Sequence, residues 1–102
     1  METDKGHERM WTVCALEFMG TAMFIFGIMS QNLVLAIPFC LMAPVVIFGD
    51  ITGGHFNPAV TLGVFITMGD FAKNIVFMIM IMVSQCLGGM LAIGLNRLGQ
   101  ID

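Results

Sequence analysis

The chain has 102 residues, of which 58% are hydrophobic and 11% are charged. Soluble domains carry roughly 25% charged residues, so a water-soluble fold could not hide this much apolar surface. The formal net charge is −3 and no cluster of basic residues occurs, which argues against nucleic-acid binding. A bilayer-embedded chain of this length can supply about three spanning helices of ~20 residues. The composition therefore predicts an all-α, multi-pass membrane protein.

The first predicted span covers about residues 11–30 and follows a polar, acidic segment, residues 1–10. This opening segment lacks the positively charged region of a cleavable signal peptide, so the first span is expected to stay in the mature protein. The second predicted span, about residues 33–51, has no charge before Asp50. Two prolines within it, Pro38 and Pro44, each remove a backbone hydrogen bond, which predicts a kinked helix.

A Gly-rich polar stretch then separates the second span from a short helix expected over residues 58–68. Asn57 suits the N-cap of this helix, Pro58 its first position and Gly69 its C-terminal cap. Asp70 is expected to cap the helix that follows. At 1.5 Å per residue the short helix reaches roughly 16 Å, about half of the ~30 Å hydrocarbon thickness. It is therefore predicted to enter the membrane without crossing it, as a re-entrant half-helix.

The third predicted span covers about residues 71–95, so that residues 11–98 form one membrane domain and residues 99–102 a polar tail. In the predicted topology, three of the four Lys and Arg residues lie on the same side of the membrane as the N-terminus, and only Arg97 lies on the opposite side. The positive-inside rule then places the N-terminus in the cytoplasm. In this orientation the half-helix enters from the cytoplasmic face.

The start of the half-helix is the expected functional site. A helix that begins at the bilayer midplane leaves its first N–H groups without intrahelical partners, where unpaired donors are costly. Water in a pore would satisfy them, with the Asn57 amide as a donor and the carbonyls of Gly54, His55 and Phe56 as acceptors. The helix dipole adds roughly half a positive charge at this point, which would repel cations, including protons.

Residues 53–61, with the sequence GGHFNPAVT, resemble the first signature loop of the major intrinsic proteins, which are the aquaporins and aquaglyceroporins. The signature Asn-Pro-Ala is formed by Asn57, Pro58 and Ala59. The resemblance implies three transmembrane helices plus one re-entrant half-helix, which is one of the two inverted repeats of a family member. The second repeat, with its own Asn-Pro-Ala loop and the Arg that follows it, is not in this sequence.

Two further patterns agree with this resemblance. The first span is similar to the family's E-x-x-G-T-x-x-F pattern, and the matching residues share one helical face: Glu17, Gly20, Thr21 and Phe24. The third span is similar to A-Q-x-x-G-A in residues 84–89, which include Gln85 and the paired glycines.

The resemblance also bears on the roles of individual residues. Glu17 would accept hydrogen bonds from the re-entrant loop, since a carboxylate at this depth needs partners, and Gln85 would support the same loop. Gly88 and Gly89 are assigned to helix packing, because small residues let backbones approach closely. Ile37 stands where the second span of the family offers an aromatic residue at the pore constriction. This departure from strict water channels allows a wider or more apolar constriction, which could admit glycerol or other small neutral solutes.

Two interpretations of His55 stay open at this stage. It is either a neutral ring that orients the loop, or a gating group that changes charge between roughly pH 5 and 8. Glu17 and His55 are not accompanied by a nucleophile, a metal cluster or a cofactor loop, so no enzyme, cofactor or metal site is expected. The three cysteines lie in apolar stretches and are expected to be buried thiols: Cys14, Cys40 and Cys86.

The expected function is that of a passive channel for water or small neutral solutes such as glycerol, in an incomplete or half-length member of the family. The alternative is a non-conducting membrane partner that assembles with full-length channels and regulates them. The expected partners are the lipid bilayer, the solute and aquaporin-like chains in homo- or hetero-oligomers. The expected location is the plasma membrane or an internal vacuolar membrane.

Overall fold

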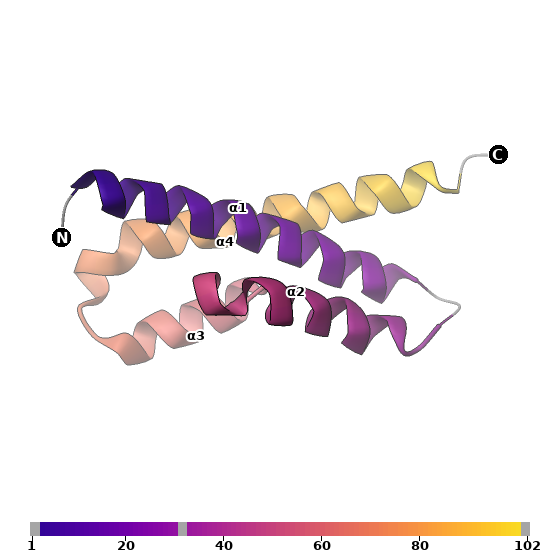
Figure 1. Ribbon diagram of the computed structural model, residues 1–102, viewed down its shortest axis with the longest axis horizontal. Coiled ribbons are helices and arrows are strands. Elements are labelled where there is room, and N and C mark those ends of the chain that lie inside the picture. Colours follow the sequence, from indigo (N-terminus) through magenta and orange to yellow (C-terminus); the bar gives the residue numbers. More distant parts are fainter. Residues whose placement is uncertain (1–2, 31–32, 101–102) are drawn as a thin grey trace.

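The computed structural model describes residues 3–30 and 33–100, with side chains described from residue 8 onward. Regular structure in these ranges is entirely helical. The four helices, shown in Figure 1, are α1 (Thr3–Met29), α2 (Ala36–Thr52), α3 (Pro58–Met68) and α4 (Phe71–Leu98).

Two of the helical segments are long and apolar enough to cross a membrane, Glu8–Met29 of α1 and all of α4. Helix α1 begins well before residue 11, because the polar residues at its start do not interrupt helical backbone. Helix α2 begins at Ala36 because the residues before it form a turn, in which Ala36 N donates to Leu33 O. With 17 residues, α2 falls below the length of the two longer segments.

The prolines of α2 have different surroundings. Pro38 lies in the first turn of the helix, where the N–H that it lacks would have no helical partner. Pro44 lies inside the helix and is buried. Of the two interruptions expected from the sequence, only Pro44 therefore removes a hydrogen bond from the helix interior.

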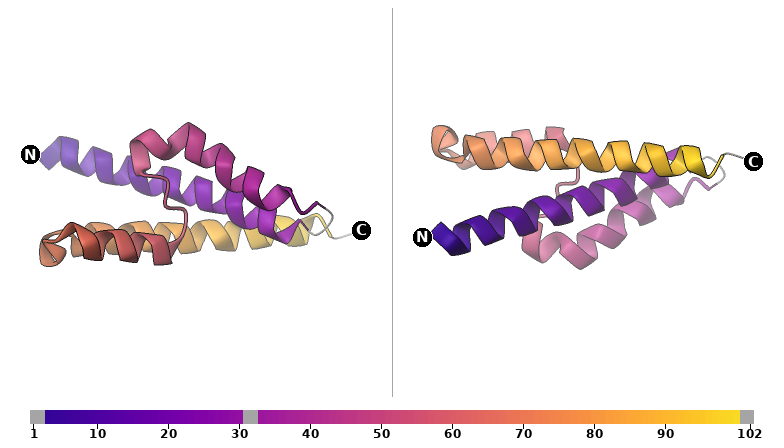
Figure 2. Two further views of the ribbon diagram at one scale, coloured as in Figure 1. Left: turned by 90° about the horizontal axis from the view of Figure 1, so that it is seen from below. Right: turned by 90° about the horizontal axis from the view of Figure 1, so that it is seen from above.

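Helices α1 and α4 run in the same direction along the 50 Å long axis of the molecule (Figure 1). Helix α1 packs against both α4 and α2, and α3 packs against α4. Helix α2 runs back from the far end, and the chain then reverses so that α3 starts near the middle of the long axis (Figure 2). Helix α3 continues to the end of the molecule where α4 begins.

The ends of α3 show why this short helix forms. The Asn57 side chain caps it, with Oδ1 accepting a hydrogen bond from Ala59 N at 2.8 Å, and Pro58 occupies its first turn. Gly69 ends it with a φ of 78°, a conformation that favours glycine. The predicted side-chain cap at Asp70 is wrong. Its backbone is left-handed and its carbonyl, not its carboxylate, accepts hydrogen bonds from the first turn of α4.

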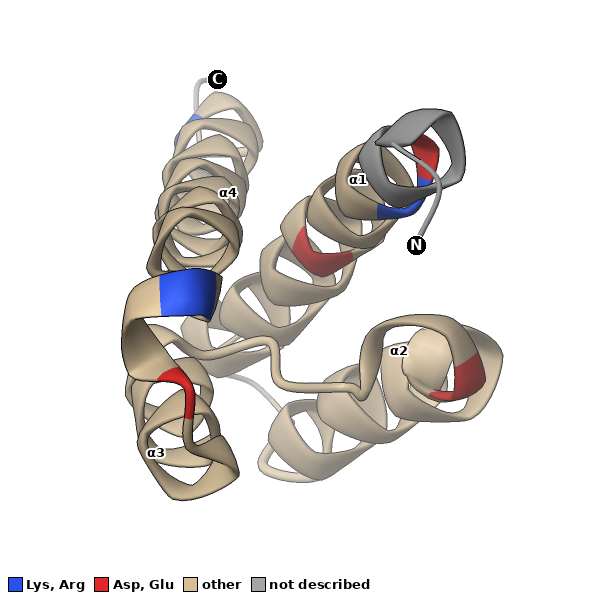
Figure 3. Ribbon diagram, turned by 90° about the vertical axis from the view of Figure 1, so that its left-hand side faces the viewer, with Lys and Arg blue, Asp and Glu red and all other residues tan. Residues whose placement is uncertain are grey.

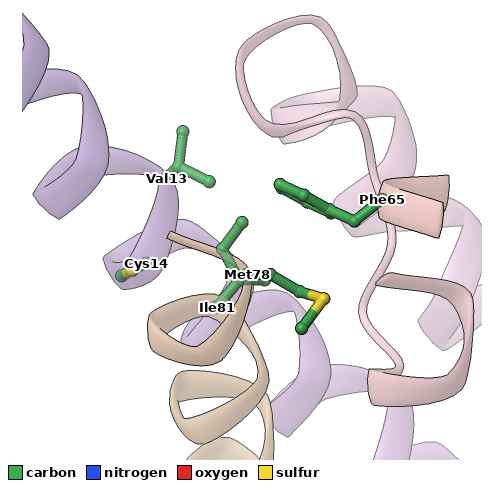
Figure 4. Packing of buried hydrophobic residues seen from close by; sticks show 5 residues of the cluster. All are labelled: Val13, Cys14, Phe65, Met78 and Ile81. Atoms are coloured by element: carbon green, nitrogen blue, oxygen red, sulfur yellow. The ribbon is translucent and has the colours of Figure 1, made fainter. Parts of the chain in front are cut away.

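The buried apolar core is small and joins α1, α3 and α4 (Figure 4). Its buried members are Val13, Cys14, Phe65, Met78 and Ile81. Many large apolar side chains instead face outward. Val34 and Val46, for example, are 82% and 74% exposed. Charged residues are sparse along the helices (Figure 3). This distribution suits a lipid environment, in which apolar side chains do not need to be hidden.

The cysteines have three different environments. Cys14 is buried in the core, Cys40 is half-buried and Cys86 is exposed. The expectation of a buried thiol is therefore wrong for Cys86. An apolar sequence context does not decide which face of a membrane helix packs against protein and which faces outward.

Candidate functional site

The loop between α2 and α3 has an unusual backbone. Gly53 and Gly54 have φ angles of 90° and 68°, which glycine adopts readily. Phe56 also lies in the left-handed region, with a φ of 50°, although a side chain disfavours it. Its ring is almost completely buried, and a Cβ at Gly20 of α1 would overlap that ring. The packing of the ring on Gly20 thus holds the loop in a strained conformation.

Glu17 ties this loop to α1. Its side chain has no exposed surface and accepts three hydrogen bonds. His55 N donates to Oε2 at 3.2 Å, Phe56 N donates to Oε1 at 2.8 Å, and Gln85 Nε2 donates to Oε1 at 2.7 Å. Because a buried carboxylate is stable only with such partners, Glu17 fixes the positions of two consecutive loop amides.

Gln85 extends the same network to α3 and α4. Its Nε2 also donates to Thr61 Oγ1 at 2.7 Å, and Thr61 Oγ1 lies 2.9 Å from His55 Nδ1. Gln85 and Thr61 are almost completely buried. The structure therefore brings together Glu17, Gln85 and His55, and it adds Thr61, for which the sequence predicts no role. The sequence feature that points to Thr61 is its position one turn after the start of α3, which brings its side chain within reach of the loop.

Asn57 presents its amide at the start of α3. Its Oδ1 is fixed by the bond from Ala59 N, so Nδ2 points away from the helix. In the described ranges, Nδ2 has no acceptor, and no hydrogen bond ends on the carbonyl oxygens of Gly54, His55 or Phe56. Gly54, His55 and Asn57 are half-buried, so the Asn57 amide and the carbonyls of Gly54 and His55 can reach a solute. Phe56 is 1% exposed as a whole residue, which leaves its carbonyl almost without accessible surface.

Ile37 is not part of this cluster. It lies in the first turn of α2 and is 39% exposed. At 1.5 Å per residue, the helix places it roughly 24 Å along the axis from Gly53. A constriction at Ile37 would therefore be a separate point on any path that also passes Asn57.

Metal-binding geometry does not occur in the described part of the chain. No group of three or more His, Cys, Asp or Glu residues there could hold a metal ion. The polar chemistry of this site consists of hydrogen-bonding groups.

Comparison with known proteins identifies the family of this chain. The family model described as "Major intrinsic protein" matches residues 5–100, so the chain belongs to the major intrinsic protein family. Members of this family are channels integral to membranes.

Several curated relatives are similar in sequence. Aquaporin-8 of Rattus norvegicus is 31% identical over 104 residues, which cover 89% of this chain and 38% of the relative. Aquaporin-8 of Notomys alexis is 29% identical over the same shares. Aquaporin PIP2-7 of Musa acuminata is 40% identical over 47 residues, 46% of this chain and 16% of the relative. The chain thus spans less than two fifths of the length of these relatives. No solved structure shows a significant match.

Proposed function

We propose that this chain supplies one half of a passive transmembrane channel for water or small neutral solutes such as glycerol. The supporting observation is the start of α3, where Asn57 Nδ2 and the carbonyls of the preceding loop residues make no hydrogen bond within the described residues. A water or alcohol hydroxyl can accept from the amide and donate to a carbonyl. A cation meets the positive end of the α3 dipole instead, which opposes its passage.

In this proposal α1, α2 and α4 each cross the membrane and α3 is re-entrant, with residues 11–98 as the membrane domain and the N-terminus in the cytoplasm. The start of α3 near the middle of the long axis supports this arrangement (Figure 2). The rest of the pore lining comes from a second repeat of opposite orientation. The exposed apolar faces of the helices suit contact with lipid and with such a repeat. The comparisons with channels do not favour a non-conducting partner.

A chimera tests this function. Residues 1–102 replace the matching part of rat aquaporin-8, and stopped-flow light scattering measures osmotic shrinkage of proteoliposomes. We expect the chimera to accelerate shrinkage, with the parent aquaporin-8 as the positive control. Proteoliposomes that contain only the 102-residue chain are expected to shrink no faster than empty vesicles. A chimera that is inserted and folded, yet as slow as empty vesicles, would contradict the proposal.

Asn57→Asp in the chimera separates solute contact from helix capping. The new carboxylate can still accept from Ala59 N, so the cap is kept. It cannot donate as Nδ2 does, and it adds a negative charge at the site. We expect water permeability to fall about tenfold, which corresponds to about 1.4 kcal/mol, at the upper end of the range of about 0.5–1.5 kcal/mol for a neutral hydrogen bond. The matched control is Asn96→Asp at the far end of α4, which should leave the permeability unchanged.

Ile37→Phe tests the constriction. The larger ring should narrow the path, so we expect glycerol permeability to fall several-fold more than water permeability in the chimera. Ile47→Phe, an exposed position on the same helix, serves as the control. Equal losses for both solutes after Ile37→Phe would show that this residue does not select by size.

A further inference from the structure

A cavity of about 200 Å³ lies between α1, α3 and α4, adjoining the loop. Three polar residues line it, Arg9 of α1, Thr52 at the end of α2 and His55 of the loop. The remaining wall is apolar and includes Val13, Phe65 and Ile81, which point towards one another in Figure 4. Among its described lining residues none is acidic.

The hydrogen bonds of Thr61 determine which nitrogen of His55 carries the proton. An amide nitrogen donates two hydrogens and accepts none, so Gln85 Nε2 donates one to Glu17 and one to Thr61 Oγ1. The Thr61 hydroxyl therefore accepts from Gln85, and its own hydrogen must go elsewhere. Its other side-chain contact in the described ranges is His55 Nδ1 at 2.9 Å. This network assigns the acceptor role to Nδ1 and places the proton of the neutral ring on Nε2.

The orientation of the ring links this proton to the cavity. Nδ1 faces Thr61, which has no exposed surface, so the opposite edge of the half-buried ring carries Nε2. Nε2 lies near the backbone of Gly53, since a Cβ built there would be 3.3 Å away. His55 lines the cavity, and within the described residues its Nε2 makes no hydrogen bond, so the Nε2–H is the donor that this ring can offer to a ligand there.

The ligand class follows from these groups. The His55 Nε2–H and the Arg9 guanidinium are both donors, and Arg9 is permanently charged. The Glu17 carboxylate already accepts hydrogen bonds from two backbone N–H groups of the loop and from the Gln85 side chain. The volume is below the roughly 300–1,000 Å³ of pockets for drug-sized ligands. We propose that the cavity binds a small monocarboxylate, with its oxygens towards Arg9 and His55 and its apolar tail against Phe65 and Ile81. This site does not depend on permeation.

The test uses the full chain in detergent micelles with ¹⁵N-labelled histidine. In His7→Gln the remaining signals belong to His55, and long-range ¹H–¹⁵N spectra distinguish a protonated from an unprotonated ring nitrogen. We expect Nδ1 unprotonated and Nε2 protonated at neutral pH. Titration with butyrate should shift the Nε2 signal to saturation, whereas butyramide, which is similar in shape but neutral, should bind at least tenfold more weakly.

Variants assign the contacts. Arg9→Gln should weaken butyrate binding at least tenfold, while Lys73→Gln, which removes an equal charge at the start of α4, should not change it. Dodecanoate distinguishes a membrane fatty acid from a free short-chain acid. If the ligand is a membrane fatty acid, dodecanoate shifts the Nε2 signal and butyrate does not. A proton on Nδ1, a shift that does not saturate with either acid, or equal binding to the Arg9 and Lys73 variants would overturn the proposal.

Discussion

Glu17→Ala is expected to lower the free energy of unfolding by about 3–5 kcal/mol. The substitution leaves three donors without their acceptor, namely the amides of His55 and Phe56 and the Nε2 of Gln85. Each unpaired buried donor costs about 1–3 kcal/mol, and water cannot easily replace the lost oxygens at this depth. The loss can be measured by titrating micelle-bound protein with dodecyl sulfate and following helix content.

Two variants make this measurement specific. Glu8→Ala removes an exposed carboxylate from the same helix and should change stability little. Glu17→Gln keeps one acceptor oxygen but turns an NH₂ group towards donors, so an intermediate loss is expected. If Glu17→Ala unfolds at the same dodecyl sulfate fraction as Glu8→Ala, the carboxylate does not hold the loop.

Gly88→Ala is expected to destabilise the chain by about 1–3 kcal/mol. A Cβ at this position would overlap the carbonyl oxygen of Phe18 and lie 3.2 Å from Ala22 N, both in the backbone of α1. Backbone cannot move aside as a side chain can, so α1 and α4 must separate. Gln85 lies one turn before Gly88, and the separation would also lengthen its hydrogen bond to Glu17.

The matched control is Gly94→Ala on the same helix, where the added Cβ meets nothing within 4 Å. Alanine favours helix over glycine by up to about 1 kcal/mol, so this change should be neutral or stabilising. The two substitutions are chemically identical, and the same dodecyl sulfate titration should give them opposite signs. Equal effects at both positions would show that α1 and α4 do not approach as closely as the structure places them.

The features that depend on neighbouring residues could be predicted from the sequence. Helix α3 has the bounds expected from its caps, because Asn57, Pro58 and Gly69 act within a few residues of chain. The sequence predicts a polar tail over residues 1–10 before the first span, whereas the helical backbone of α1 extends back to Thr3. Polar residues mark the limit of an apolar span but not that of a helix. Asp70 failed as a cap because a side-chain cap also requires suitable backbone angles at that residue.

The features that depend on distant residues could not be derived from spacing. The partners of Glu17 lie 38, 39 and 68 residues further along the chain, and only the family resemblance pointed to them. Thr61 received no role because its contact with Gln85 crosses between two helices. The exposure of Cys86 likewise depends on the rotation of α4 against α1. The role of Ile37 stays a prediction.

The separation of Glu17 and Gln85 along the sequence also has a consequence for biosynthesis. Because the chain is made from its N-terminus, α1 exists long before the 68 residues that separate Glu17 from Gln85 have been added. Until α4 is synthesised, neither Gln85 nor the α4 surface on which α3 packs is present. The re-entrant loop can therefore take its final position only after most of this chain has left the ribosome. A nascent chain arrested before Gln85 should show a Glu17 carboxylate still accessible to water, and one arrested well beyond Arg97 should not.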